Sequence, residues 1–144
     1  MSPRLTVLAF LAAFAGCAST PRPEPGPPPP FPAPAHAETP AIASLMDSAR
    51  TDALAGRLAN AGASLERALR IEPRNPRLWQ ELARVRLQQQ DYVQAESCAH
   101  RSNSWAGDDE TLRADNWRLI AQAREARGDS EGARAALEAA QRQK

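Results

Sequence analysis

Apolar residues recur every three or four positions from Ala41 onward in this 144-residue chain, which is the spacing of one face of an α-helix. Three short pairs interrupt the pattern and indicate tight turns: Gly56-Arg57, Gln90-Asp91 and Gly128-Asp129. No alternating run of β-branched residues occurs after residue 41. We therefore expect an all-α domain over 41–144, with helices near 42–55, 58–71, 76–89, 92–105, 111–127 and 130–142.

The expected helices form three similar pairs. The second pair carries Trp79, Leu82, Ala83, Tyr92 and Ala95; Trp117, Ile120, Ala121 and Ala133 follow at a 38-residue step, and Ala61, Leu65, Ala68 and Pro73 belong to the first pair. This pattern resembles the tetratricopeptide repeat, a 34-residue helix-turn-helix unit. The resemblance implies three repeats, at about 42–75, 76–109 and 114–144, stacked as a short right-handed solenoid.

The second repeat departs from the family pattern after its turn. Ser102 stands where the family has alanine, and Gly107 stands where it has proline. Four extra residues also separate the second and third repeats. We expect these residues, near Ser104–Thr111, to lengthen the connection between the two repeats and to change their stacking angle.

The N-terminus has the pattern of an export signal. One positive charge, Arg4, precedes an apolar run that is too short to span a bilayer. Phe14-Ala15-Gly16-Cys17 resembles a bacterial lipobox, although Phe14 stands where leucine is usual. The resemblance implies removal of residues 1–16 and acylation of Cys17, and Ala18 in place of aspartate then favours the outer membrane. The alternative is an ordinary secretory signal that happens to contain a cysteine.

Residues 17–40 form a proline-rich linker. Ten of the 13 prolines lie between Pro21 and Pro40, and proline lacks the backbone donor that helices and central strands need. We expect a disordered, extended spacer that reaches roughly 70 Å, at about 3.1 Å per residue. The alternative is a docking site for the aromatic groove of another protein.

Charge and candidate chemistry narrow the function. Without residues 1–16 the chain has 17 basic residues, since Arg4 is lost from the total of 18, and 17 acidic ones, which argues against nucleic-acid binding. With Cys17 acylated, Cys98 is a lone thiol, and we expect it to be packed inside the domain. His36 and His100 have no partner at zinc-ligand spacing.

The acidic run Asp108-Asp109-Glu110 fits the N-terminal dipole of a helix better than a cation site. No catalytic constellation or phosphate loop occurs in the sequence. We therefore expect a protein that is not an enzyme and has no cofactor, metal or small-molecule substrate.

The family resemblance implies a binding groove, because the first helix of each tetratricopeptide repeat lines the concave surface. The residues expected to line this groove are Met46, Arg50, Arg77, Gln80, Arg84, Gln88, Arg118 and Gln122. Arg50, Arg84 and Gln122 share one repeat position and should form a ladder. A mixed apolar and basic groove suits a peptide that bears carboxylates. The alternative is that these arginines are simply solvated.

The order of lipid anchor, spacer and repeat module resembles that of the tetratricopeptide lipoproteins that activate class A penicillin-binding proteins. This resemblance implies an outer-membrane lipoprotein facing the periplasm, which binds and activates a bifunctional peptidoglycan synthase. The alternative is a scaffold for a pilus, secretion or outer-membrane protein insertion machinery. A peptidoglycan-cleaving enzyme is disfavoured because the sequence lacks a His–Asp, Cys–His or Glu–Glu arrangement.

Overall fold

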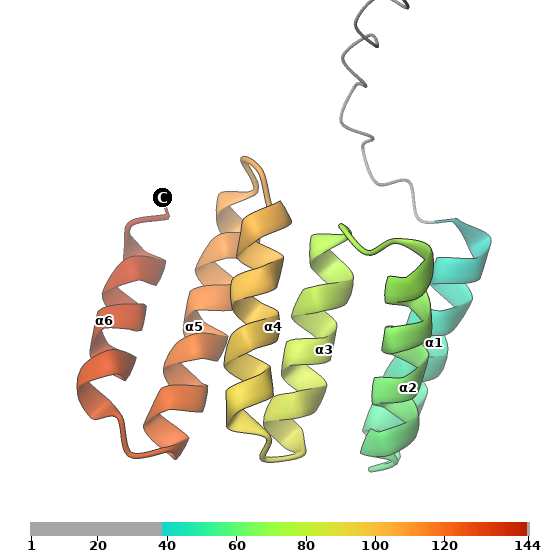
Figure 1. Ribbon diagram of the computed structural model, residues 1–144, viewed down its shortest axis with the longest axis horizontal. Helices are drawn as coiled ribbons and strands as arrows, with labels where there is room; N and C mark the ends of the chain where they lie inside the picture. Colours follow the sequence, from blue (N-terminus) through green and yellow to red (C-terminus); the bar gives the residue numbers. More distant parts are fainter. Residues whose placement is uncertain (1–38, 144) are drawn as a thin grey trace, which may run out of the picture. The chain divides into compact units, whose positions relative to one another are not determined.

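Six α-helices make up the part of the chain that the computed structural model describes, residues 39–143 (Figure 1). They are α1 (Pro40–Leu54), α2 (Leu58–Ile71), α3 (Pro76–Gln88), α4 (Tyr92–Trp105), α5 (Glu110–Ala126) and α6 (Ser130–Gln141). No strand occurs between residues 39 and 143. The all-α prediction is confirmed, and every helix ends within two residues of its expected bounds. The predictions for the signal segment, for Cys17 and for the linker up to residue 38 concern residues outside the described part of the chain.

The helix starts follow from local side-chain chemistry. The Asn75 side chain accepts hydrogen bonds from the backbone N–H groups of Arg77 and Leu78, and Pro76 occupies the first helical position of α3. Asp109 accepts from the backbone N–H of Leu112 at 2.9 Å and so begins α5. The expectation that the acidic run complements a helix N-terminus is therefore confirmed for Asp109.

The turns inside the three helix pairs are equivalent. Gly56, Gln90 and Gly128 all have positive φ angles, of 74°, 64° and 82°. They lie at steps of 34 and 38 residues, the same two steps that relate the helix pairs in the sequence. Glycine adopts this left-handed conformation freely, whereas Gln90 carries a steric cost of about 1 kcal/mol or more.

The core is built from small residues between helices and larger ones that fill the gaps. Ala83 on α3 and Ala95 on α4 are both fully buried and allow the two helices of the middle pair to approach closely. Leu65, Leu78 and Ile120, which come from three successive pairs, are at most 1% exposed. Figure 1 shows the helices standing side by side in sequence order, so each pair covers the apolar side of its neighbour.

The expectation of a longer connection between the second and third repeats is wrong. The α4–α5 connection spans residues 106–109 and is as long as the α2–α3 connection, residues 72–75. The extra residues lie in α5 instead, which has 17 residues against 13 in α3. Asp109 caps α5 one turn earlier than the repeat pattern requires, so the insertion becomes helix.

Ser102, which departs from the family pattern, forms part of a buried polar network. Its hydroxyl donates to the carbonyl oxygen of Pro76 at 2.7 Å and accepts from the Nδ2 of Asn116, also at 2.7 Å. Both Ser102 and Asn116 are fully buried. The serine therefore connects α3, α4 and α5, and it gives the buried Nδ2 of Asn116 an acceptor, while the Oδ1 of Asn116 has no partner among the described residues.

Candidate protein-binding surfaces

A groove between α1 and α3 contains half of the predicted binding residues. Met46, Arg50, Arg84 and Gln88 all line it, and Leu65 and Val85 contribute buried apolar surface to it. We call this surface the α1–α3 groove. The first two members of the predicted ladder, Arg50 and Arg84, therefore lie on one surface.

The groove arginines are each close to a carboxylate on the same helix. Arg50 lies 3.4 Å from Asp47 and Arg84 lies 3.8 Å from Glu81, in both cases three residues along the helix. Farther along, Arg118 is 2.5 Å from Asp115 in the same i,i+3 geometry. Such exposed pairs contribute little stability, but they leave the groove with little uncompensated positive charge. The groove is thus less basic than the arginine ladder alone predicts.

The other predicted groove residues lie elsewhere. Arg118 and Gln122 line a separate hollow between α5 and α6, together with Leu137. Arg77 points toward the α4–α5 connection, where its guanidinium lies 3.9 Å from Asp109. Gln80 is only 7% exposed, so its side chain is not presented to a partner. Gln80 lies on the opposite side of α3 from Leu78 and Leu82. It is buried because α3 packs against α2, α4 and α5.

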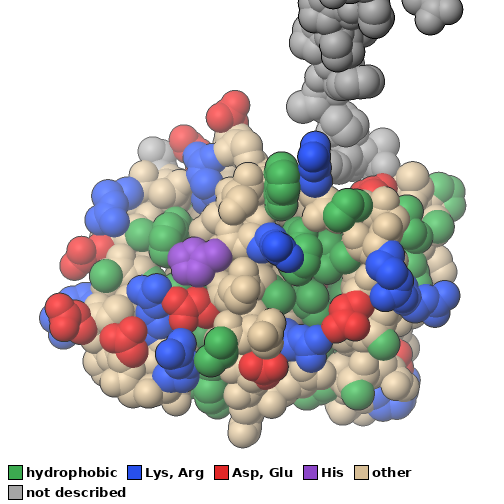
Figure 2. Space-filling view, viewed as in Figure 1, with side chains coloured by type: hydrophobic (Ala, Val, Ile, Leu, Met, Phe, Trp, Pro, Cys, Tyr) green, Lys and Arg blue, Asp and Glu red, His purple; other side chains and the backbone are tan. Residues whose placement is uncertain are grey.

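A second surface, which the sequence reasoning missed, lies between α2 and α4 and is floored by α3. Trp79, Leu69, Leu82 and Cys98 form its apolar part, and Arg70, Arg86, Arg101, Glu66 and Gln94 surround them. We call this surface the α2–α4 hollow. Figure 2 shows hydrophobic side chains gathered on the face that carries these helices, with arginines around them. No local motif marks this surface in the sequence, because its lining residues come from three different helices.

A guanidinium group lies over a tryptophan ring in the hollow, and a second such pair lies outside its lining. The Cζ of Arg101 lies 4.8 Å from the ring centroid of Trp79, and the Cζ of Arg74 lies 5.1 Å from that of Trp105. The Trp79 ring is also fixed by a 2.8 Å hydrogen bond from its Nε1 to the carbonyl oxygen of Pro73. Cation–π contact and hydrogen bonding thus hold this cluster in one arrangement.

Cys98 lies at the floor of the hollow and behaves as a packed apolar residue, as expected from the sequence. It is 6% exposed, and burial raises the pKa of its thiol to about 11, against an opposing effect of the Arg86 and Arg101 charges. A thiol with this pKa is almost entirely protonated at neutral pH and is a poor nucleophile.

Two further features bear on what the domain can do. Within residues 39–143 there is no group of three or more His, Cys, Asp or Glu side chains placed to hold a metal ion. None of the described helices is long and apolar enough to cross a membrane. His100 is exposed, and its ring contacts Trp117 edge-on at a centroid distance of 5.4 Å.

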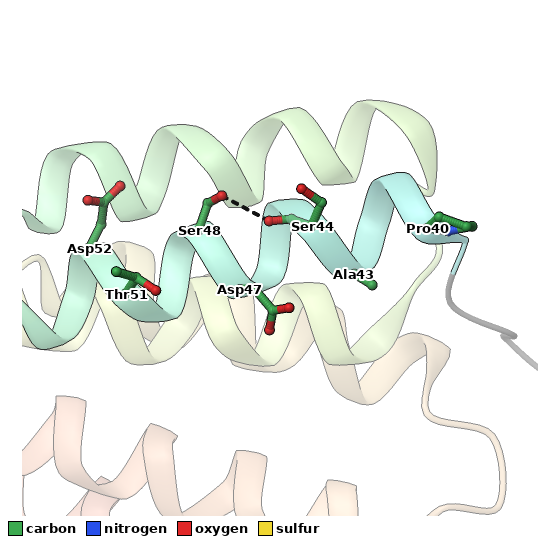
Figure 3. Close-up of a pocket in the computed structure, with 7 residues that line it drawn as sticks. All are labelled: Pro40, Ala43, Ser44, Asp47, Ser48, Thr51 and Asp52. Carbon is green, nitrogen blue, oxygen red and sulfur yellow. Dashed lines mark hydrogen bonds between the residues drawn. The ribbon is translucent and has the colours of Figure 1, made fainter.

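A shallow polar hollow also runs along α1. Figure 3 shows that all of its lining side chains, among them Ser44, Asp47 and Ser48, come from this one helix. The Ser48 hydroxyl donates to the carbonyl oxygen of Ser44 at 2.9 Å, so its hydrogen-bond partner lies on the same helix. This polar surface is the solvent-facing side that the first helix of a repeat array needs, and no second element contributes to it.

The helix pairs and their two surfaces define a tetratricopeptide-repeat domain, a fold that acts by binding other proteins. In agreement, residues 53–114 match the tetratricopeptide-repeat family. The chain is also similar to a solved structure, the globular C-terminal domain of P. aeruginosa LpoP, with 45% sequence identity and a TM-score of 0.70. The match covers 72% of this chain and 97% of that structure. The chain therefore belongs to the tetratricopeptide-repeat family of LpoP. No curated protein matches it significantly.

Proposed function

We propose that this protein is an outer-membrane lipoprotein that binds a class A penicillin-binding protein in the periplasm and activates peptidoglycan synthesis by it. The similarity to the LpoP domain, at 45% identity over nearly all of that structure, carries the proposal. The protein acts by contact and not by catalysis. Its one described thiol, Cys98, is buried and protonated at neutral pH, which is consistent with such a role.

The α1–α3 groove is the proposed contact surface for the synthase. It combines apolar side chains such as Met46 with polar groups that include Gln88, and its arginines retain free N–H donors beside their intrahelical carboxylates. A segment of the synthase that presents both apolar and charged side chains matches this lining. Because the Arg84–Glu81 pair is exposed and weak, a carboxylate of the partner can compete for Arg84.

The anchor is part of the proposal. A lipid on Cys17 would hold the protein at the outer membrane, and the proline-rich linker would extend the repeat domain toward the synthase. Replacement Cys17→Ala should release the full chain from the membrane fraction without changing the helical content of the repeats. Retention of this variant in the membrane fraction would show that the lipid anchor is wrong.

The functional test measures glycan polymerisation by the purified class A synthase of the same organism, with and without the full-length protein. The wild type should bind the synthase and raise its polymerisation rate. The variant Arg84→Glu should weaken binding by about tenfold and change the melting temperature little, because substitutions at exposed positions rarely alter stability by more than about 0.5 kcal/mol. Arg134→Glu is the matched control, since Arg134 is an exposed helix arginine outside the groove.

The outcomes separate the parts of the proposal. If the wild type neither binds the synthase nor changes its rate, the synthase is not the partner. If Arg84→Glu binds as tightly as Arg134→Glu, the partner contacts another surface. Co-purification with a secretin or an outer-membrane insertion complex in place of the synthase would favour the scaffold function.

A further inference from the structure

The α2–α4 hollow has no role in the proposed contact through the groove, yet it combines exposed aromatic surface with arginines. Its aromatic group is Trp79, which contributes its ring to the hollow while packing against the core. Two large apolar side chains outside this lining are also exposed, Trp105 at the end of α4 (42%) and Ile71 at the end of α2 (53%). Aromatic residues and arginine are the types most enriched at the energetic centres of protein interfaces.

Two arginines that line this hollow, Arg70 and Arg101, have no carboxylate partner among the described residues, and neither has Arg74 in the α2–α3 connection. Arg70, Arg74 and Arg101 form no ion pair and no side-chain hydrogen bond with any residue from 39 to 143, and all three are exposed. Arg86 of the same hollow differs, since it pairs with Glu66 at 2.5 Å and donates to Gln89 at 2.9 Å. The hollow therefore carries positive charge that the described part of the chain does not compensate.

Contact with a tryptophan ring restricts the side chains of two of these arginines. Stacking on a tryptophan uses the flat face of a guanidinium group and leaves its N–H donors free at the edge. Arg101 is fixed on Trp79, and Trp105, one turn later on α4, fixes Arg74. Since less side-chain freedom remains to be lost, a bidentate contact with a carboxylate costs less entropy at these positions.

We propose that the α2–α4 hollow is a second docking site, which takes an acidic segment of a partner protein. A large apolar side chain of that segment packs on Trp79, and carboxylates on either side of it bind Arg70 and Arg101. Charge complementarity selects this occupant, because the uncompensated groups are all cationic and the floor is apolar. The chain's own linker fits less well, because residues 18–38 contain two acidic residues and the basic Arg22.

The test uses the full-length protein in detergent and a fluorescent peptide, Glu-Glu-Leu-Phe-Glu-Glu, with binding followed by anisotropy at low salt. The wild type should bind it saturably, and a peptide with lysine in place of each glutamate should not bind. The double variant Arg70→Glu/Arg101→Glu should weaken binding by about tenfold or more. The matched control Arg134→Glu changes an exposed arginine on α6, which also lacks an ion pair within the described residues, and should bind like the wild type.

Each other result overturns the proposal in a distinct way. Absence of saturable binding at millimolar peptide, or equal affinity of the double variant and the control, removes the acidic-segment site. Displacement of the probe by a peptide covering residues 21–34 but not by unlabelled acidic peptide would assign the hollow to the chain's own linker. The probe is not the synthase, and the variants lie outside the groove. Failure of the peptide to bind therefore leaves the proposed function standing, and failure of the protein to bind the synthase leaves the hollow site standing.

Discussion

The two surfaces of this small repeat domain both carry arginines, but those of the groove lie beside carboxylates and, among the described residues, two of those in the hollow do not. In the α1–α3 groove, Arg50 and Arg84 each lie within 4 Å of a carboxylate three residues earlier. In the α2–α4 hollow, Arg70 and Arg101 have no such partner within the described residues, and Arg101 stacks on a tryptophan instead. The number of arginines on a surface therefore does not determine its charge, because the neighbours of each arginine decide it.

The difference has a simple structural origin. The groove helices carry acid and arginine at i,i+3, a spacing that places both side chains on one face of the helix. On α2 and α4 the nearby acids are engaged across helices: Glu66 with Arg86, and Glu96 with Arg124 and Arg127. We infer that the groove favours a partner of mixed charge, whereas the hollow favours an acidic one.

The largest loss of stability is expected from a substitution in the packed interior on which both surfaces depend. Ala95 on α4 is fully buried, and Ala95→Arg places a long cation in a closely packed space. We expect a loss of about 3 kcal/mol or more in the free energy of unfolding, with loss of binding at both surfaces. Urea unfolding followed by circular dichroism measures it. Ser97→Arg, at an exposed position of the same helix, should be nearly neutral.

The thiol of Cys98 reports on the hollow alone. Its pKa rises from 9.0 to about 11 on burial, so at pH 8 alkylation by iodoacetamide should be about a hundredfold slower in the folded than in the unfolded chain. The folded chain holds this proton to higher pH, so the free energy of unfolding should decrease as pH rises from 9.0 to about 11. Mass spectrometry of the peptide containing Cys98 measures the rate.

A variant of the hollow checks the cause of this pKa. Arg101 is a cation that lowers the pKa of Cys98, so Arg101→Glu should raise that pKa and slow alkylation further. The groove variant Arg84→Glu should leave the rate unchanged. Faster alkylation of Arg101→Glu would mean that the arginine shields the thiol and that access, not charge, controls the reaction.

The buried network should affect stability without affecting either surface. Ser102→Ala removes the donor to the Pro76 carbonyl and one of the two acceptors of the Asn116 Nδ2. We expect a loss of about 1–3 kcal/mol in the free energy of unfolding and unchanged affinity at the groove and the hollow. Ser104→Ala is the matched control on α4, because the Ser104 hydroxyl makes an exposed bond to the His100 carbonyl. Equal costs for both variants would contradict the role given to the network.

The sequence predicts the parts of this molecule that depend on local chemistry. Helical spacing, turn residues and the cap at Asp109 are encoded within a few residues, and the repeat step adds the register of the pairs. Cys98 could also be placed inside, since it follows the periodicity of Ala95 and Ala99. The connection before α5 could not, because the same residues suit a longer loop or an extra helical turn.

The surfaces depend on contacts between residues distant in the sequence. Arg86 pairs with Glu66, 20 residues away in the sequence, and Arg101 on α4 contacts Trp79 on α3. A repeat pattern therefore does not show which arginine is left without a carboxylate partner. The burial of Gln80 likewise depends on the packing of α3 against α2, α4 and α5. The sequence therefore located the groove helices but not the hollow, and the functional roles of both surfaces stay proposals.

The smallest effect is expected from a substitution that makes the groove resemble the hollow. Glu81→Gln removes the carboxylate 3.8 Å from Arg84 and leaves that arginine without its intrahelical partner, as Arg101 is in the hollow. The groove should then gain affinity for the acidic peptide by a few-fold, since exposed pairs are worth about 0.2–1 kcal/mol. In the Arg70→Glu/Arg101→Glu background, where the hollow no longer binds, anisotropy should show this new site, and added salt should weaken it.

Asp115→Asn releases Arg118 outside the groove and serves as the matched control. If both variants bind the peptide equally, the intrahelical carboxylates are not what distinguishes the groove from the hollow.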